Sequence, residues 1–292
     1  MQVTSKILLL QNLMTDLSKW LGLDRFADAK SQYDEDGYLV FENILSSNEL
    51  AAIKDALAPY LDTPLKGRND FEGTRTNRVY ALLAKDRIFA ELAIHPLALA
   101  FAEADLGMSL RLSACLAIQL HRDETVQPWH YDDAHMVAPR PRDAWGLSAF
   151  WAIDDTIREN GATQFIRGSH KWGDDQSPLN LSKDVFEKHD RDYSEGDDIL
   201  DIVTPELPAG SLMIAKSTLW HRGGANHTDK PRTIITPQYC VGWARQLENM
   251  VLAVPPEKAA DLPKRAQELI GYSIHHPFMG YVDGMHPTKT FS

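Results

Sequence analysis

The chain has 292 residues, of which 43% are hydrophobic and 24% charged, and its formal net charge at pH 7 is -11. This size and composition suit one large globular domain and exclude a largely disordered chain. The acidic balance argues against a nucleic-acid partner, and two cysteines are too few for a disulfide scaffold, which fits a reducing cytoplasm.

The first twenty residues contain an apolar run that resembles a signal peptide. Gln11 and Asn12 interrupt this run and no small-residue cleavage site follows it, so we expect no targeting segment. The apolar residues that recur every three or four positions are Leu10, Leu13, Leu17, Trp20 and Leu21. This spacing predicts an amphipathic helix for docking or dimer contact. No later stretch approaches the roughly 20 apolar residues that span a membrane, so we expect a soluble monomer or homodimer.

The next part of the chain is predicted to be mainly helical. A short strand is expected over residues 37–41, followed by a helix that Ser46 or Ser47 caps. Residues 63–79 are polar and contain glycine, which predicts a loop. The apolar stretch after this loop predicts helical structure that is interrupted at Pro96.

From residue 110 the hydrophobic period changes to two, which predicts a long strand over residues 110–121. Further strands are expected at 129–132, 147–153, 162–166, 199–203, 212–215 and 233–243. Several short strands without intervening helices predict a barrel or a sandwich. An acidic loop over residues 173–199 is expected to be functional or mobile, and residues 256–272 predict a C-terminal helix.

The stretch QPWHYDDAHM, residues 127–136, concentrates groups that bind metals. On an extended segment, His130 and Asp132 point to the same face, whereas a helix would separate them by about 200°. Trp129 and Tyr131 would then pack on the opposite face. The pair alone is a weak signal, because surface histidines and aspartates are frequent.

A third ligand must come from another strand, and His221 ends the apolar stretch SLMIAKSTLW. Two histidines and one carboxylate are the ligand set of non-haem Fe(II) oxygenases, which leaves positions open for other ligands. Arg232 follows eleven positions after His221 and offers a guanidinium that can clamp a carboxylate. Gln127 lies just upstream of the histidine, and Thr163 lies in a turn that leads into a strand.

Four motifs occur in the order and spacing of a known family. These motifs are QPWHYDD, ENGATQFIRGSHKW, PAGSLMIAKSTLWHRGGANHTDKPR and GYVDGMHP. Together they resemble the phytanoyl-CoA dioxygenase family of Fe(II)/2-oxoglutarate oxygenases and its fungal alkaloid- and terpenoid-tailoring members. The resemblance implies a mainly β fold with flanking helices and a double-stranded β-helix (jelly-roll, cupin-like) core at 109–245. This core would share one domain with a mainly helical part at 1–108 and a C-terminal helix and closing tail at 246–292.

The resemblance also implies a reaction and the residues that carry it. His130, Asp132 and His221 would bind Fe(II), Arg232 would hold the far carboxylate of 2-oxoglutarate, and Gln127, Thr163 would contact this cosubstrate. With O2 the enzyme would hydroxylate a C–H bond of a small organic molecule and release succinate and CO2. Family members that halogenate lack the carboxylate ligand, so the presence of Asp132 disfavours halogenation.

Other residues have weaker interpretations. Asp133 is expected to support the site by hydrogen bonds, and His135 to line the pocket. Arg78 and Tyr80 are candidate substrate contacts in a loop that, in the family, covers the mouth of the active site, although a solvated loop explains them equally. An alternative function is a metal-binding cupin-type barrel that acts as an isomerase or a sensor. The substrate is left open, and no basic cluster suits the phosphates of coenzyme A.

Overall fold

The computed structural model describes residues 17–21, 25–61, 67–180 and 200–291. The chain forms two compact units, each assembled from separated stretches. The first unit comprises 1–35, 80–115 and 237–292, and the second comprises 36–79 and 116–236. The single domain predicted from the sequence stays a prediction.

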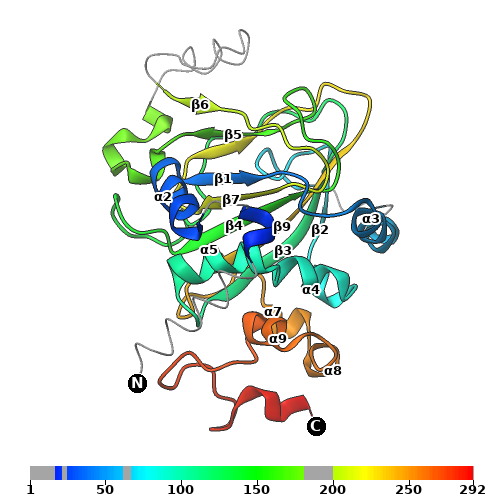
Figure 1. Cartoon of the computed structure of the whole chain (residues 1–292), viewed down its shortest axis with the longest axis vertical. Helices are drawn as coiled ribbons and strands as arrows, with labels where there is room; N and C mark the ends of the chain where they lie inside the picture. The colour runs from blue at the N-terminus through cyan, green and yellow to red at the C-terminus, as the bar shows by residue number, and fades with distance from the viewer. Residues whose placement is uncertain (1–16, 22–24, 62–66, 181–199, 292) are drawn as a thin grey trace. The chain divides into compact units, whose positions relative to one another are not determined.

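Two antiparallel sheets form the framework of the second unit (Figure 1). The larger sheet has the strand order β1-β7-β4-β9-β3-β2, and the smaller has the order β6-β5-β8. The strands of the larger sheet are β1 (Tyr38–Phe41), β2 (Thr76–Val79), β3 (Arg111–Leu120), β4 (Gly146–Ala152), β7 (Leu212–Lys216) and β9 (Arg232–Cys240). Those of the smaller sheet are β5 (Thr163–Ile166), β6 (Ile202–Val203) and β8 (His221–Gly223). Strands β3 and β9 continue into the first unit.

The two sheets bury their apolar faces against each other. Phe150 of β4 and Met213 of β7 belong to the same buried cluster as Phe165 of β5 and Val203 of β6. Packing of this kind excludes water from the space between the sheets and provides the main driving force for folding. The sequence prediction of short β-strands around an apolar core is therefore confirmed in the second unit.

Two predicted elements differ from the structure. The predicted loop at 63–79 ends in a strand, β2, which pairs with β3 in the register Thr76↔Leu120. The polar sequence of β2 shows no hydrophobic alternation that would predict a strand. Its Thr76 side chain is buried nevertheless, and its hydroxyl donates a hydrogen bond to the carboxylate of Glu124 (2.7 Å). The strand predicted at 129–132 is wrong: only His130 forms a β-bridge, and 132–135 form a turn.

The long helix of the second unit, α3 (Ser47–Leu61), begins at the predicted cap. The backbone N–H of Glu49 donates to Ser46 Oγ (3.3 Å), and the Glu49 carboxylate accepts from the Ser46 backbone N–H (2.8 Å). This reciprocal pair satisfies two N–H groups at the start of the helix. Within the predicted loop 173–199, residues 173–180 form two short 3-10 turns, η3 (Asp174–Gln176) and η4 (Pro178–Asn180), and 181–199 lie outside the described residues.

The first unit contains most of the helices. They are α2 (Phe26–Asp36), α4 (Ile88–Ala93), α5 (Pro96–Leu106), α7 (Met250–Ala253), α8 (Pro256–Ala259) and α9 (Lys264–Ile270). The predicted interruption at Pro96 is confirmed, because Pro96 is the first residue of α5 and His95 caps it. The helix predicted at 256–272 is split into α8 and α9 by a break that contains Pro263.

The start of the chain is described only in part. Residues 17–21 are helical, with Leu17 and Leu21 buried, whereas Leu10 and Leu13 lie outside the described residues. Cys115 and Cys240 are buried free thiols. Among the described helices, none has the length and apolar character needed to cross a lipid bilayer.

Candidate metal centre

Backbone pairing between two distant segments brings the two predicted histidine ligands together. His130 and His221 exchange both of their backbone hydrogen bonds, N–H of His130 to the carbonyl of His221 at 3.0 Å and the reverse at 2.8 Å. Directly opposed residues of an antiparallel pair place their side chains side by side. The centroids of the two imidazole rings are accordingly 4.3 Å apart. The turn after His130 then returns Asp132 to the same point.

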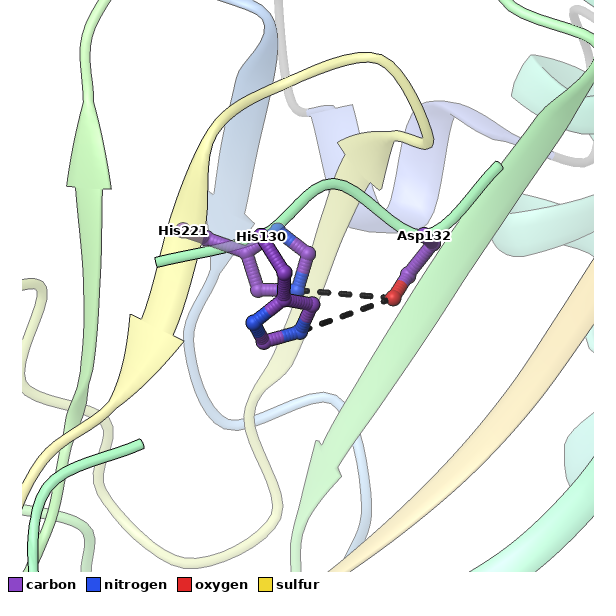
Figure 2. Close-up of side chains that lie close together, drawn as sticks. All are labelled: His130, Asp132 and His221. Carbon is purple, nitrogen blue, oxygen red and sulfur yellow. Dashed lines mark ion pairs between the residues drawn. The ribbon is translucent and has the colours of Figure 1, made fainter. Parts of the chain in front are cut away.

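The three side chains converge on one small volume (Figure 2). Asp132 Oδ1 lies 3.5 Å from His221 Nε2 and 3.9 Å from His130 Nε2. One ligand atom from each residue lies within 4.8 Å of the other two. These separations exceed the roughly 2.9 Å of a direct N–H···O bond, so the three atoms leave space for an ion between them.

Hydrogen bonds on the far sides of the rings prepare both histidines for metal binding. His130 Nδ1 lies 2.9 Å from the carbonyl oxygen of Pro128, and His221 Nδ1 lies 2.9 Å from that of Leu219. A carbonyl oxygen can only accept, so each Nδ1 carries a proton and each Nε2 is the ring nitrogen that faces Asp132. This is the arrangement that orients metal-binding imidazoles in proteins.

The protonation states also suit a cation. Burial and the neighbouring His221 lower the pKa of His130 to about 4, so this ring is neutral near pH 7. Burial alone would raise the pKa of Asp132, but the charge of His221 and the hydrogen bond from Ser148 hold that pKa below its ordinary value. Burial alone would lower the pKa of His221, but the Asp132 carboxylate raises it. The site therefore presents an ionised carboxylate, as a divalent metal requires.

Ser148 of β4 fixes the orientation of the Asp132 carboxylate. Its hydroxyl donates to Asp132 Oδ2 at 2.5 Å, and the serine is 2% exposed. This bond occupies one carboxylate oxygen and leaves Oδ1 directed at the histidines.

We expect Ser148→Ala to weaken binding of a divalent metal by about 10- to 100-fold, because removing the partner of a metal ligand typically has this effect. Ser217 provides a matched control, since its hydroxyl donates to the neighbouring Asp133 (2.9 Å). Calorimetric titration with Co²⁺ should show unchanged affinity in Ser217→Ala. Equal metal affinities in Ser148→Ala and the wild type would show that Ser148 does not orient the ligand.

The Asp133 side chain joins a buried network separate from the three ligands. Its carboxylate accepts two hydrogen bonds from Arg142, at 2.8 and 2.9 Å, and one from the backbone N–H of Trp145 at 3.2 Å. Asp133 is 2% exposed. A bidentate ion pair of this kind anchors the turn that follows the metal ligands.

Asp133→Ala should therefore lower the free energy of unfolding by about 3–5 kcal/mol, because it leaves the largely buried Arg142 guanidinium without its counter-charge. His135 is exposed, and His135→Ala should change stability by less than about 1 kcal/mol. Urea unfolding of both variants measures the difference. Similar midpoints for Asp133→Ala and the wild type would contradict the assigned role.

Arg232, the predicted carboxylate clamp, is a buried cation. It begins β9, is 2% exposed, and donates to the backbone carbonyls of Gly161 and Asn160. Burial lowers its pKa to about 10, so it remains charged at pH 7. Among the described residues, no carboxylate forms an ion pair with it. A guanidinium buried with carbonyl partners alone retains a strong attraction for an anion.

The predicted cosubstrate contacts lie near His221. The Gln127 amide donates to the carbonyl of Phe71 (2.6 Å) and accepts from the backbone N–H of Gly223 (2.9 Å). Thr163 pairs with Gly223 across β5 and β8. Since side chains alternate along a strand, Thr163 shares a face with Phe165, whose ring centroid lies 5.8 Å from that of His221.

The three predicted substrate contacts differ in exposure and in hydrogen-bond partners. Arg78 is 8% exposed, and its Nε donates to the carbonyl of Glu72 (2.9 Å), so the guanidinium is part of the fold. Tyr80 is 37% exposed and belongs to the first unit. His135 is exposed, and its Nδ1 lies 3.1 Å from the carbonyl of Asp132.

Two neighbours of the site escaped the sequence analysis. Ser148 had a usable signal, since it is the only hydroxyl residue in the otherwise apolar strand GLSAFWA. Phe71 had none: it lies in a polar segment, and its ring reaches His130 only through the tertiary structure, with centroids 4.7 Å apart.

Comparison with known proteins gives a family and a fold. The family model described as phytanoyl-CoA dioxygenase (PhyH) matches residues 33–234. Dioxygenase af480 of Aspergillus fumigatus is 27% identical over 267 residues, which cover 87% of this chain and 78% of that protein. Dioxygenase cnsJ of Penicillium expansum is 26% identical over 281 residues, with 86% and 78% covered.

Two solved structures with the same fold are described with 2-oxoglutarate, which is also called α-ketoglutarate. SnoN, a non-haem α-ketoglutarate-dependent epimerase from nogalamycin biosynthesis, aligns with a TM-score of 0.58 and 24% identity over 74% of this chain and 80% of its own. HygX from Streptomyces hygroscopicus, with nickel and 2-oxoglutarate bound, aligns with a TM-score of 0.59 and 18% identity over 76% and 90%. The predicted double-stranded β-helix is thereby confirmed.

Proposed function

The chain belongs to the phytanoyl-CoA dioxygenase family of iron- and 2-oxoglutarate-dependent enzymes, and we propose that it hydroxylates an unactivated C–H bond of a small organic metabolite. The observation that carries the proposal is the convergence of His130, Asp132 and His221 in the unit that also buries Arg232. Membership of a dioxygenase family disfavours the alternative of a non-oxygenase barrel.

The donor set fits Fe(II). Two imidazoles and one carboxylate suit a non-haem ferrous ion and leave further coordination positions for ligands from solution. The three side chains come from a β-bridge, a turn and the start of β8, so no single flexible segment carries the whole set. We infer that these residues hold Fe(II) with little rearrangement.

The cosubstrate requires a second anchor, which we assign to Arg232. The buried guanidinium would pair with the distal carboxylate of 2-oxoglutarate, with the Gln127 amide and the Thr163 hydroxyl as further contacts. When bound, iron and 2-oxoglutarate use O2 to place one oxygen atom in succinate, with loss of CO2, and the other in the substrate. The chain would orient the reactants and exclude water from the site. Phe150 and Phe165, whose rings lie beside His221, would exclude water on that side.

The direct test is succinate formation with Fe(II), O2 and 2-oxoglutarate across a panel of uncharged metabolites. A true substrate should stimulate succinate release and gain one oxygen atom, as mass spectrometry would detect. Stimulated succinate release with a product of unchanged mass would contradict hydroxylation and leave the dioxygenase-family assignment in place.

A further inference from the structure

A turn in the second unit places one exposed aromatic side chain against a proposed iron ligand. The Phe71 ring meets the His130 ring edge to face, with centroids 4.7 Å apart and an interplanar angle of 75°. Phe71 is nevertheless 44% exposed. A ring that contacts a ligand on one side and solvent on the other lies at the border between the metal site and the molecules that approach it.

The turn that carries Phe71, residues 67–73 (hereafter the Phe71 turn), is held by its own side chains. Asn69 Oδ1 accepts from the backbone N–H groups of Phe71 (3.1 Å) and Glu72 (2.9 Å). The Arg68 guanidinium donates to the Glu72 carboxylate, with Nε at 2.9 Å from Oε2. Bonds of this kind reduce the conformational freedom that an exposed turn otherwise has.

Further bonds tie the turn to the strand that carries a metal ligand. The carbonyl of Phe71 accepts from Gln127 Nε2 at 2.6 Å and from Arg78 Nη2 at 3.4 Å. The same Gln127 amide accepts from the backbone N–H of Gly223, two positions after His221. The backbone of Phe71 is thus linked through Gln127 to the strand that carries His221.

The ring surfaces around the two histidines are apolar. His221 has Phe165 and Phe150 beside it, at centroid distances of 5.8 and 6.3 Å, and both phenylalanines are buried. Phe71 adds an aromatic surface on the His130 side that solution molecules can reach. Apolar walls around a few fixed polar groups are typical of sites for small molecules.

We propose that Phe71 is a specificity-determining residue that contacts an uncharged, apolar ring or alkyl part of the substrate beside His130. Asn69 is a positioning residue, which acts by holding the Phe71 turn. This inference rests on the proposed function, since it assigns the substrate side of the same site. Phe71 favours substrates that have an apolar portion next to the C–H bond that reacts.

The test uses Mn²⁺ in place of iron, saturating 2-oxoglutarate, and two probes, indole and glucose. Bound Mn²⁺ accelerates the nuclear relaxation of nearby probe protons, so titration gives the affinity of each probe at the metal site. Indole should bind with measurable relaxation and glucose should not. Phe71→Ala should weaken indole binding about tenfold, the effect of losing roughly one aromatic contact.

Conservative variants distinguish the loss of an apolar contact with indole from a general disruption of the Phe71 turn. Phe71→Leu keeps an apolar surface and should retain most of the indole affinity. Asn69→Asp keeps the acceptor oxygen and should resemble the wild type, whereas Asn69→Ala should weaken indole binding. Phe278 of the first unit is 69% exposed, and Phe278→Ala should change nothing.

The possible failures are distinguishable. Electron paramagnetic resonance of the same samples reports Mn²⁺ binding independently of the probes. Absence of Mn²⁺ binding in the wild type would overturn the proposed function and the inference with it. Normal Mn²⁺ and 2-oxoglutarate binding, with equal indole relaxation in Phe71→Ala and the wild type, would overturn the inference alone.

Discussion

Asp132→Ala should abolish succinate formation and weaken divalent metal binding by more than about 100-fold. Loss of a ligand should cost more than loss of a group that only hydrogen-bonds to a ligand, which weakens metal binding by up to about 100-fold. The physical reason is that Asp132 supplies the only carboxylate oxygen in the cluster with His130 and His221. Calorimetry with Co²⁺ and an assay with Fe(II) measure the two effects.

The adjacent aspartate provides a matched control with the opposite pattern. Asp133→Ala should retain metal affinity in its folded fraction while losing stability, because Asp133 pairs with Arg142. If Asp133→Ala folds too poorly to study, Ser217→Ala perturbs the same carboxylate more mildly. Equal loss of metal binding at both aspartates, or at neither, would contradict the ligand assignment.

Arg232→Met should weaken 2-oxoglutarate binding at least about 30-fold, because truncating one side of a buried charge pair costs about 2 kcal/mol or more. Metal affinity should be unchanged, since Arg232 is not a ligand. The free energy of unfolding should fall by about 1–3 kcal/mol, because the carbonyls of Gly161 and Asn160 lose their donor while methionine fills a similar space. Titration of the Co²⁺ form with 2-oxoglutarate measures the effect.

Arg222 is the matched control for this change. It is also buried, and its guanidinium donates to Gln164 (2.6 Å) and stacks on Trp129 with a centroid distance of 4.7 Å. Arg222→Met should leave the 2-oxoglutarate affinity unaltered even if it lowers stability. Comparable weakening in Arg222→Met and Arg232→Met would indicate a general effect of lost charge rather than a clamp.

The apolar strands were predictable because buried strand positions are occupied mainly by apolar residues, a pattern that is visible in the sequence. Strand β4 is buried at every position, and β7 is buried at all but the last. Strand β2 shows no such pattern, since Thr76 and Arg78 are buried through hydrogen bonds rather than through apolar side chains. Polar burial of this kind depends on partners that are distant in the chain, such as Glu124.

The structure brings His130, Asp132 and His221 together, as the predicted ligand set requires, but partly for a different reason than the sequence suggested. His130 and Asp132 do not share one face of a strand, because a turn begins at Asp132. What aligns His130 with His221 is a backbone bridge between segments 91 positions apart, an arrangement that periodicity cannot reveal. His221 was predicted from its place at the end of the apolar stretch SLMIAKSTLW and from the resemblance to the family, and its role as a ligand stays a prediction.

Anaerobic addition of 2-oxoglutarate to the Fe(II)-loaded protein tests the proposed site most directly. A ferrous ion chelated by an α-keto acid has a weak visible charge-transfer absorption, and we expect it to saturate at one equivalent of 2-oxoglutarate and to be absent in Asp132→Ala. Fe(II) binding without any such absorption, in protein that also binds 2-oxoglutarate, would show that the metal and the cosubstrate do not meet at His130, Asp132 and His221.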